Sequence, residues 1–175
     1  MDAMQLGIRA TSIDVVVMAF VLFHLATPDA ALSDVRRALT LGGSVGTVTW
    51  AEDPELEATR VWEAELDAHG AWDPAPVAPS DHTRTDTPEK MATLFARAGL
   101  DPVKIWIERF EHRWGLERFI ALRRTFGRTM RKLGSLDPAT QAAFLERTRA
   151  RLSALDAGAF VYRAAVVCGI ARRPR

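Results

Sequence analysis

The sequence predicts an α/β fold in which strands and helices alternate along the chain. In DVVVMAF at 14–20, the unbroken apolar run that follows Asp14 is typical of a strand that is covered on both faces. A helical segment follows it, and SVGTVTW at 44–50 then returns as a second strand. Strand, helix and strand joined by short links indicate a right-handed parallel crossover, the building unit of open α/β sheets.

The helix between these strands carries signals at both ends. Thr27 is placed to cap it, and Pro28 favours its first position. The glycine pair at 42–43 is expected to end it. The crossover brings the ends of both strands to one edge of the sheet, which is where open α/β sheets bind ligands.

The rest of the chain continues the alternation. Three prolines between Trp72 and Asp81 predict a rigid surface connection. We expect helices at 54–69, 87–99, about 116–133 and 137–155, and strands at 102–112 and 159–172. Thr87 is expected to cap the second of these helices and Asp137 the last. The last two strands are expected to lie side by side and antiparallel, so the sheet has about four strands with helices on both faces.

Composition limits the class of function. A net charge of +1, from 23 basic and 22 acidic residues, gives no overall attraction to nucleic acid or to an anionic membrane. Cys168 is the one cysteine and no signal-peptide pattern opens the chain, so we expect a cytoplasmic protein. The apolar segment at 13–25 is too short to cross a bilayer. The four scattered histidines give no metal-ligand spacing.

Three stretches carry a family resemblance: DAMQL at 2–6, DVVVMAFVLFHL at 14–25 and RRALTLGGSVGTVTW at 36–50. Together they resemble the second half of a class I, Rossmann-like S-adenosylmethionine-dependent methyltransferase, in the small-molecule, type 11-like branch. In that family the first stretch meets the adenine, and the second is the fourth strand with the segment passing the methyl donor. The third is the turn into the fifth strand, with Leu41 where proline is usual.

The resemblance implies the C-terminal part of the methyltransferase sheet, in the order fourth, fifth, seventh, sixth strand. It implies a single domain over 1–175, with a helical lid inserted at 112–157. The cofactor would be S-adenosylmethionine, contacted by Asp2, Ala3, Ala19 and Phe20. The family's G-x-G-x-G turn and its ribose-binding acid have no counterpart in this sequence. We therefore expect a truncated domain whose isolated monomer binds the cofactor weakly or not at all.

Loss of the family's first strand would leave Val15 to Phe20 as an open apolar edge. This edge should be covered by another chain segment, and three possibilities remain. The segment could belong to a second copy of this chain, to a separate N-terminal methyltransferase fragment, or to upstream residues lost through a wrongly assigned start at Met1 or a truncated gene. The competing hypothesis is a non-catalytic remnant or oligomerising module that associates through this edge.

Methyl transfer is an in-line displacement, for which an enzyme supplies positioning, exclusion of water and sometimes a base. His24, where the first strand exits toward the binding edge, is a candidate base, with a wall residue as the alternative. Asp81 and His82, after the proline-rich connection, are a candidate acid and base, with a solvated loop as the alternative. Trp50, at the end of the second strand, is a candidate wall of the substrate site or ordinary packing.

The predicted lid adds two candidate substrate contacts. Phe119 lies on an apolar stripe, and Arg123 belongs to a group of basic residues that would suit an anionic substrate. The alternatives are core packing for the stripe and a solvated face for the arginines. Cys168 alternates inside the last strand and is interpreted as a small packed residue, not a nucleophile.

Overall fold

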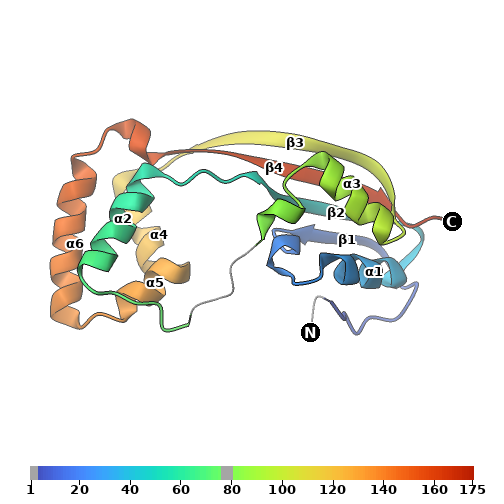
Figure 1. Cartoon of the computed structure of the whole chain (residues 1–175), viewed down its shortest axis with the longest axis horizontal. Helices are drawn as coiled ribbons and strands as arrows, with labels where there is room; N and C mark the ends of the chain where they lie inside the picture. The colour runs from blue at the N-terminus through green and yellow to red at the C-terminus, as the bar shows by residue number, and fades with distance from the viewer. Residues whose placement is uncertain (1–3, 76–80) are drawn as a thin grey trace. The chain divides into compact units, whose positions relative to one another are not determined.

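The structure is a computed structural model that describes residues 4–75 and 81–175 (Figure 1). Two compact units divide the chain, and each has its own hydrophobic core. The sheet unit is built from 1–53, 79–110 and 164–175, and the helical unit from 54–78 and 111–163. The helical unit therefore takes in 54–78 as well as the predicted lid.

The sheet unit contains a four-stranded sheet in the order β1-β2-β4-β3 (Figure 1). Its strands are β1 (Ile13–Ala19), β2 (Leu39–Glu52), β3 (Asp101–Arg113) and β4 (Val161–Arg172), of which β3 and β4 continue into the helical unit. β1 pairs with β2 in parallel, and β2 pairs with β4 antiparallel. The predicted crossover and strand order are confirmed.

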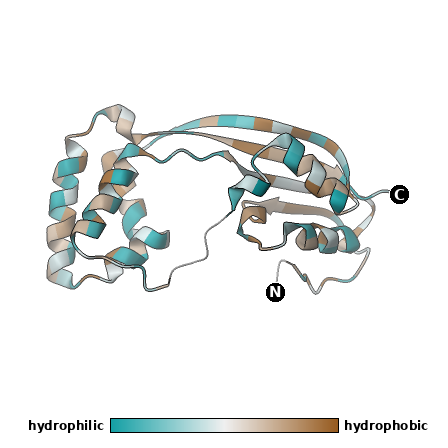
Figure 2. Ribbon diagram, viewed as in Figure 1, coloured by the Kyte–Doolittle hydropathy of each residue, from teal (hydrophilic) through white to brown (hydrophobic). Residues whose placement is uncertain are grey.

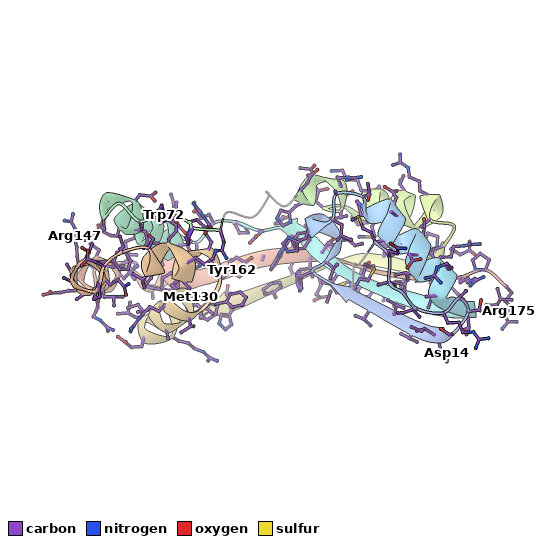
Figure 3. All side chains as sticks on the ribbon, turned by 90° about the horizontal axis from the view of Figure 1, so that it is seen from below. Asp14, Trp72, Met130, Arg147, Tyr162 and Arg175 are labelled. Carbon is purple, nitrogen blue, oxygen red and sulfur yellow. The ribbon has the colours of Figure 1, made fainter. Side chains whose placement is uncertain are left out.

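Two helices cover one face of this sheet, α1 (Pro28–Ala38) and α3 (Pro88–Arg97). Thr87 caps α3 as predicted, because its hydroxyl accepts the Lys90 N–H at 3.3 Å. Both helices contribute to one core with the inward residues of the strands, among them Leu32, Phe95 and Val167. Figure 3 shows both helices on the same side of the sheet. Helices were expected on both faces, but in the described part of this unit they cover one face.

The other face of β1 is apolar and open. Val16 and Met18 pack toward the core, whereas Val15 and Val17 on the opposite face are 64% and 71% exposed. β1 is also the outer strand of the order, and it is drawn in brown shades in Figure 2. In the described part of the chain β1 is therefore the outer strand, as predicted, and the apolar side chains exposed beside its edge lie on the open face of the sheet.

The end of α1 differs from the expectation. The helix stops at Ala38, and the glycine pair at 42–43 lies inside β2 instead of ending the helix. The guanidinium of Arg173 donates to the carbonyls of Arg36, Arg37 and Leu39, at 3.1, 3.2 and 2.6 Å. A distant side chain thus satisfies the last carbonyls of the helix, which a glycine turn would otherwise do.

The helical unit packs four helices: α2 (Glu57–Ala68), α4 (Leu116–Thr125), α5 (Gly127–Gly134) and α6 (Pro138–Ser153). Asp137 caps α6 as predicted, accepting the N–H groups of Ala139 and Thr140. The helix predicted over 116–133 is wrong as a single element. It breaks at Gly127, whose φ of +69° lies in the left-handed region that glycine tolerates best.

An ion pair ties the segment after α2 to α5. Arg131 donates from Nε to Asp73 Oδ1 and from Nη2 to Asp73 Oδ2, each at 2.8 Å. This two-pronged bond to Arg131 lowers the pKa of Asp73 from its ordinary 3.8 to about 2. The folded state therefore favours the ionised carboxylate more than the unfolded state does.

We expect this pair to add a pH dependence to stability. The folded pKa of Asp73 lies below the unfolded one, so the contribution is complete above about pH 4 and is lost as the pH falls through about 2. Asp73→Asn and Arg131→Gln should both flatten the fall in the free energy of unfolding between these pH values. Urea denaturation at several pH values measures the free energy of unfolding. If it falls with pH in both variants as steeply as in the parent chain, the ion pair does not contribute this pH dependence.

Gly169 of β4 occupies a tight position in the sheet unit. It faces Thr47 of β2, and a Cβ added there would lie 2.8 Å from the Thr47 hydroxyl and 2.9 Å from the ring of Phe95. That ring is fully buried and cannot swing away into solvent. In contrast, a Cβ added to Gly46 of β2 would meet no atom within 4 Å.

Gly169→Ala should therefore lower the free energy of unfolding by about 1–3 kcal/mol, the usual cost of overpacking a core. Gly46→Ala is the matched control in the neighbouring strand, and it should leave stability unchanged or slightly raised. Chemical denaturation of both variants measures the difference. Equal effects at the two positions would show that the packing around Gly169 is looser than described.

Candidate functional site

The candidate site begins where the chain leaves β1. Phe20 follows Ala19, the last residue of the strand, and has a φ of +56°. Its N–H donates to the carbonyl of Val48 at 2.8 Å, which extends the pairing with β2 by one residue. A bulky residue rarely adopts a positive φ, and such strain is found preferentially at functional sites.

Three aromatic rings lie together at this part of the sheet, with Trp50 next to both of the others. The ring centroid of Phe20 lies 4.8 Å from that of Trp50, which lies 6.2 Å from that of Phe110. They come from the end of β1, from β2 and from β3. Phe20 and Phe110 are each 39% exposed. We call these three residues the aromatic row.

Both candidate histidines gather around one buried ring beside the row. Phe23 lies in the short helical turn η1 (Leu22–His24), 6.5 Å from Phe20. Its ring centroid is 4.3 Å from that of His24 and 4.4 Å from that of His82. His24 is exposed, whereas Nδ1 of His82 is buried and has no hydrogen-bond partner among the described residues.

Hydrogen bonds hold the segment after the proline-rich connection at this edge. The N–H of Asp81 donates to the carbonyl of Phe23 at 3.0 Å. The hydroxyl of Thr49 in β2 donates to the carbonyl of Thr85 at 2.8 Å. The turn η2 (His82–Arg84) is therefore anchored to both η1 and β2.

Asp81 has a clear local role. Its carboxylate accepts the N–H and the hydroxyl of Thr83, at 3.1 and 2.6 Å. These bonds, the hydroxyl bond first, lower the pKa of Asp81 and cap η2. An acid and base pair of Asp81 with His82 stays a prediction.

Other predicted site residues lie elsewhere. Asp2 and Ala3 lie outside the described residues. Phe119 is fully buried in the core of the helical unit, edge-on to Trp62 and Phe160. Those contacts match the packing alternative.

Arg123 packs within the same unit. Its guanidinium lies 5.0 Å from the ring centroid of Phe119 and donates to the hydroxyl of Thr59 at 2.6 Å. Burial lowers the pKa of Arg123. Its side chain is thus held inside the helical unit and is not part of a solvated face.

Two residues of the edge were missed by the sequence interpretation, Phe23 and Phe110. Phe110 lies an odd number of residues after Ile105, which packs against the core, so strand alternation places it on the opposite face. The face on which Phe110 lies could therefore have been predicted from the sequence. Cys168 is half-buried, and burial raises the pKa of its thiol, which fits a packed residue.

The hollow between α1 and α3 lies away from these rings. It encloses about 320 Å³ and is formed by Asp29, Arg84, Glu89, Lys90, Thr93, Leu94 and Arg97. Arg84 pairs with Asp29 at 3.6 Å, and Lys90 pairs with Asp86 at 2.6 Å. No group of three or more potential metal-ligating side chains occurs in 4–75 and 81–175. Among the helices described, none is long and apolar enough to cross a membrane.

The strain at Phe20 is testable by substitution. At a positive φ, glycine is favoured over alanine by about 1 kcal/mol, because alanine keeps a Cβ that clashes with the backbone. Phe20→Gly should therefore be more stable than Phe20→Ala. At neighbouring Ala19, within β1, Ala19→Gly should be less stable than the parent chain. Thermal denaturation measures both, and a Phe20→Ala variant at least as stable as Phe20→Gly would refute the strained turn.

Comparison with known proteins identifies the fold. Residues 1–46 match the model of a family described as a methyltransferase domain. A protein from Bacillus halodurans, described as a methyltransferase, superposes with a TM-score of 0.55 at 15% identity, over 100% of this chain and 70% of that one. An S-adenosylmethionine-dependent methyltransferase from Methanosarcina mazei superposes with a TM-score of 0.50 at 13% identity, over 99% of this chain and 65% of that one.

A search of curated protein sequences found no match to this chain. The superposition on the Bacillus halodurans protein takes in the whole of this chain, and the family match covers β1, α1 and the start of β2. The chain therefore has the α/β fold of the class I, Rossmann-like S-adenosylmethionine-dependent methyltransferases.

Proposed function

We propose that this protein takes part in S-adenosylmethionine-dependent methylation of a small molecule at the carboxyl edge of β1 and β2. The observation that carries the proposal is the gathering of the aromatic row and both histidines at that edge. Open α/β sheets bind their ligands there. A cytoplasmic setting is part of the proposal, supported by the single, unpaired cysteine.

The described residues fit one wall of a cofactor site. Ala19 and Phe20 would line it, since the half-exposed ring of Phe20 offers an apolar surface beside the strand end. Asp2 and Ala3 would contact the adenine. When bound, S-adenosylmethionine supplies an electrophilic methyl group. The sequence contains no glycine-rich turn and no ribose-binding acid to form the opposite wall.

The chain's own residues would position the acceptor and move a proton. Trp50 would hold the substrate beside the methyl donor, which favours in-line attack. His24 or His82 would take the proton of the acceptor group, because a neutral imidazole has a nitrogen lone pair that accepts a proton. The buried, unpartnered Nδ1 of His82 supports its role as a hydrogen-bonding group in the working site.

A partner at the β1 edge would cover the open strand, and a separate N-terminal methyltransferase fragment would also supply the glycine-rich turn and the ribose-binding acid. The exposed valines of β1, Val15 and Val17, support association of another strand with Val15 to Phe20. The partner would be a second copy of this chain or a separate N-terminal methyltransferase fragment. The same exposure also supports the alternative function, a non-catalytic module that associates through this edge.

Calorimetric titration with S-adenosylhomocysteine tests the enzymatic proposal. The isolated monomer should bind it weakly or not at all, and an associated form should bind it. Phe20→Ala should weaken that binding, because the apolar wall is lost. Tight binding by a monomer would refute the need for a partner, and no binding in any associated form would favour the non-catalytic module.

Association itself can be tested without a cofactor. Val17→Lys should reduce self-association or fragment binding in sedimentation experiments, because a charge at this apolar edge opposes strand pairing. Leu41→Lys is the matched control, since Leu41 is 60% exposed but lies in β2. If both variants behave alike, the β1 edge is not the site of association.

A further inference from the structure

The aromatic row has the features of a stacking surface more than of core packing. Its two outer rings, Phe20 and Phe110, are each 39% exposed, whereas core aromatic rings such as Phe95 and Phe119 are fully buried. The interplanar angles are moderate, 44° between Phe20 and Trp50 and 37° between Trp50 and Phe110. The buried edge-on pairs of the helical unit are near perpendicular, with Trp62 and Phe144 at 84°.

Backbone strain supports a role for the ring of Phe20. A residue at φ +56° costs of order 1–3 kcal/mol, and glycine or asparagine would reduce that cost. Phenylalanine instead places a large, half-exposed ring against Trp50. The strained backbone at Phe20 therefore holds an aromatic ring exposed at the end of the strand.

An ion pair close to the row in sequence lies on the other face of the sheet. Glu52, two residues after Trp50, accepts a hydrogen bond from Arg109, the neighbour of Phe110, at 3.0 Å. Arg109 lies four residues after Ile105, so alternation places it on the core side and Phe110 on the open side. This pair therefore does not contribute to the surface of the row.

We propose that the aromatic row binds a planar aromatic ring that carries a hydroxyl or amino group, and that Phe110 helps to select it. This substrate class rests on the proposed methyltransferase function, for which such a group is a chemically suitable methyl acceptor. Stacking on side-chain rings tolerates many planar ligands and favours them over saturated molecules of the same size.

The test uses the full chain without cofactor and two probes, 1-naphthol and its saturated counterpart decahydro-1-naphthol. In NMR titrations, 1-naphthol should bind at least fivefold more tightly. Phe110→Leu keeps an apolar side chain but removes the ring, and it should weaken 1-naphthol binding by about tenfold. Trp106→Ala, in the same strand but outside the row, should leave binding unchanged, and the spectra report whether each variant is folded.

Equal binding of the two probes, or unaltered binding by Phe110→Leu, would overturn the proposal. A greater loss in Trp106→Ala than in Phe110→Leu would also overturn it, because the ligand would then lie elsewhere. The readout contains no S-adenosylmethionine, so a failure here leaves the proposed methyl transfer untouched. Conversely, a chain that never transfers methyl groups could still show the stacking preference.

Discussion

The parallel pairing of β1 with β2 is the interaction on which the rest of the sheet unit depends. The crossover through α1 aligns both strand ends at one edge, and the last pairing bond, from Phe20 to Val48, fixes the strained turn. That turn sets the ring of Phe20 against Trp50 and brings Phe23 within contact of both histidines. The pairing of β1 with β2 therefore determines both the sheet and the positions of the side chains in the candidate site.

The same pairing leaves the other edge of β1 without a neighbouring strand in the described part of the chain. A sheet strand presents N–H and C=O groups on both sides, and in the described part of the chain β2 pairs with one side of β1. Exposed Val15 and Val17 add apolar surface to these polar groups. An unpaired strand edge beside exposed apolar side chains favours pairing with another chain, which is why association is part of the proposed function.

Local signals predicted the elements that depend on nearby residues. The crossover, the caps at Thr87 and Asp137 and the strand order followed from short patterns and from the family resemblance. The end of α1 did not, because Arg173, 136 positions beyond Arg37, donates to the carbonyls of Arg36 and Arg37 in its last turn. At the site, Phe20, Trp50 and both histidines were predicted near the edge. Phe110 was missed because its neighbours come from strands distant in sequence.

Hydrogen exchange along β1, followed residue by residue by NMR in a monomeric sample, tests this account most directly. Alternate N–H groups of Ile13–Ala19 point toward β2 and should be protected, while those between them should exchange rapidly with water. Uniform protection would show that the β1 edge is already covered in the monomer. Uniformly rapid exchange would show that the parallel pairing with β2 does not form, and either result would contradict the account.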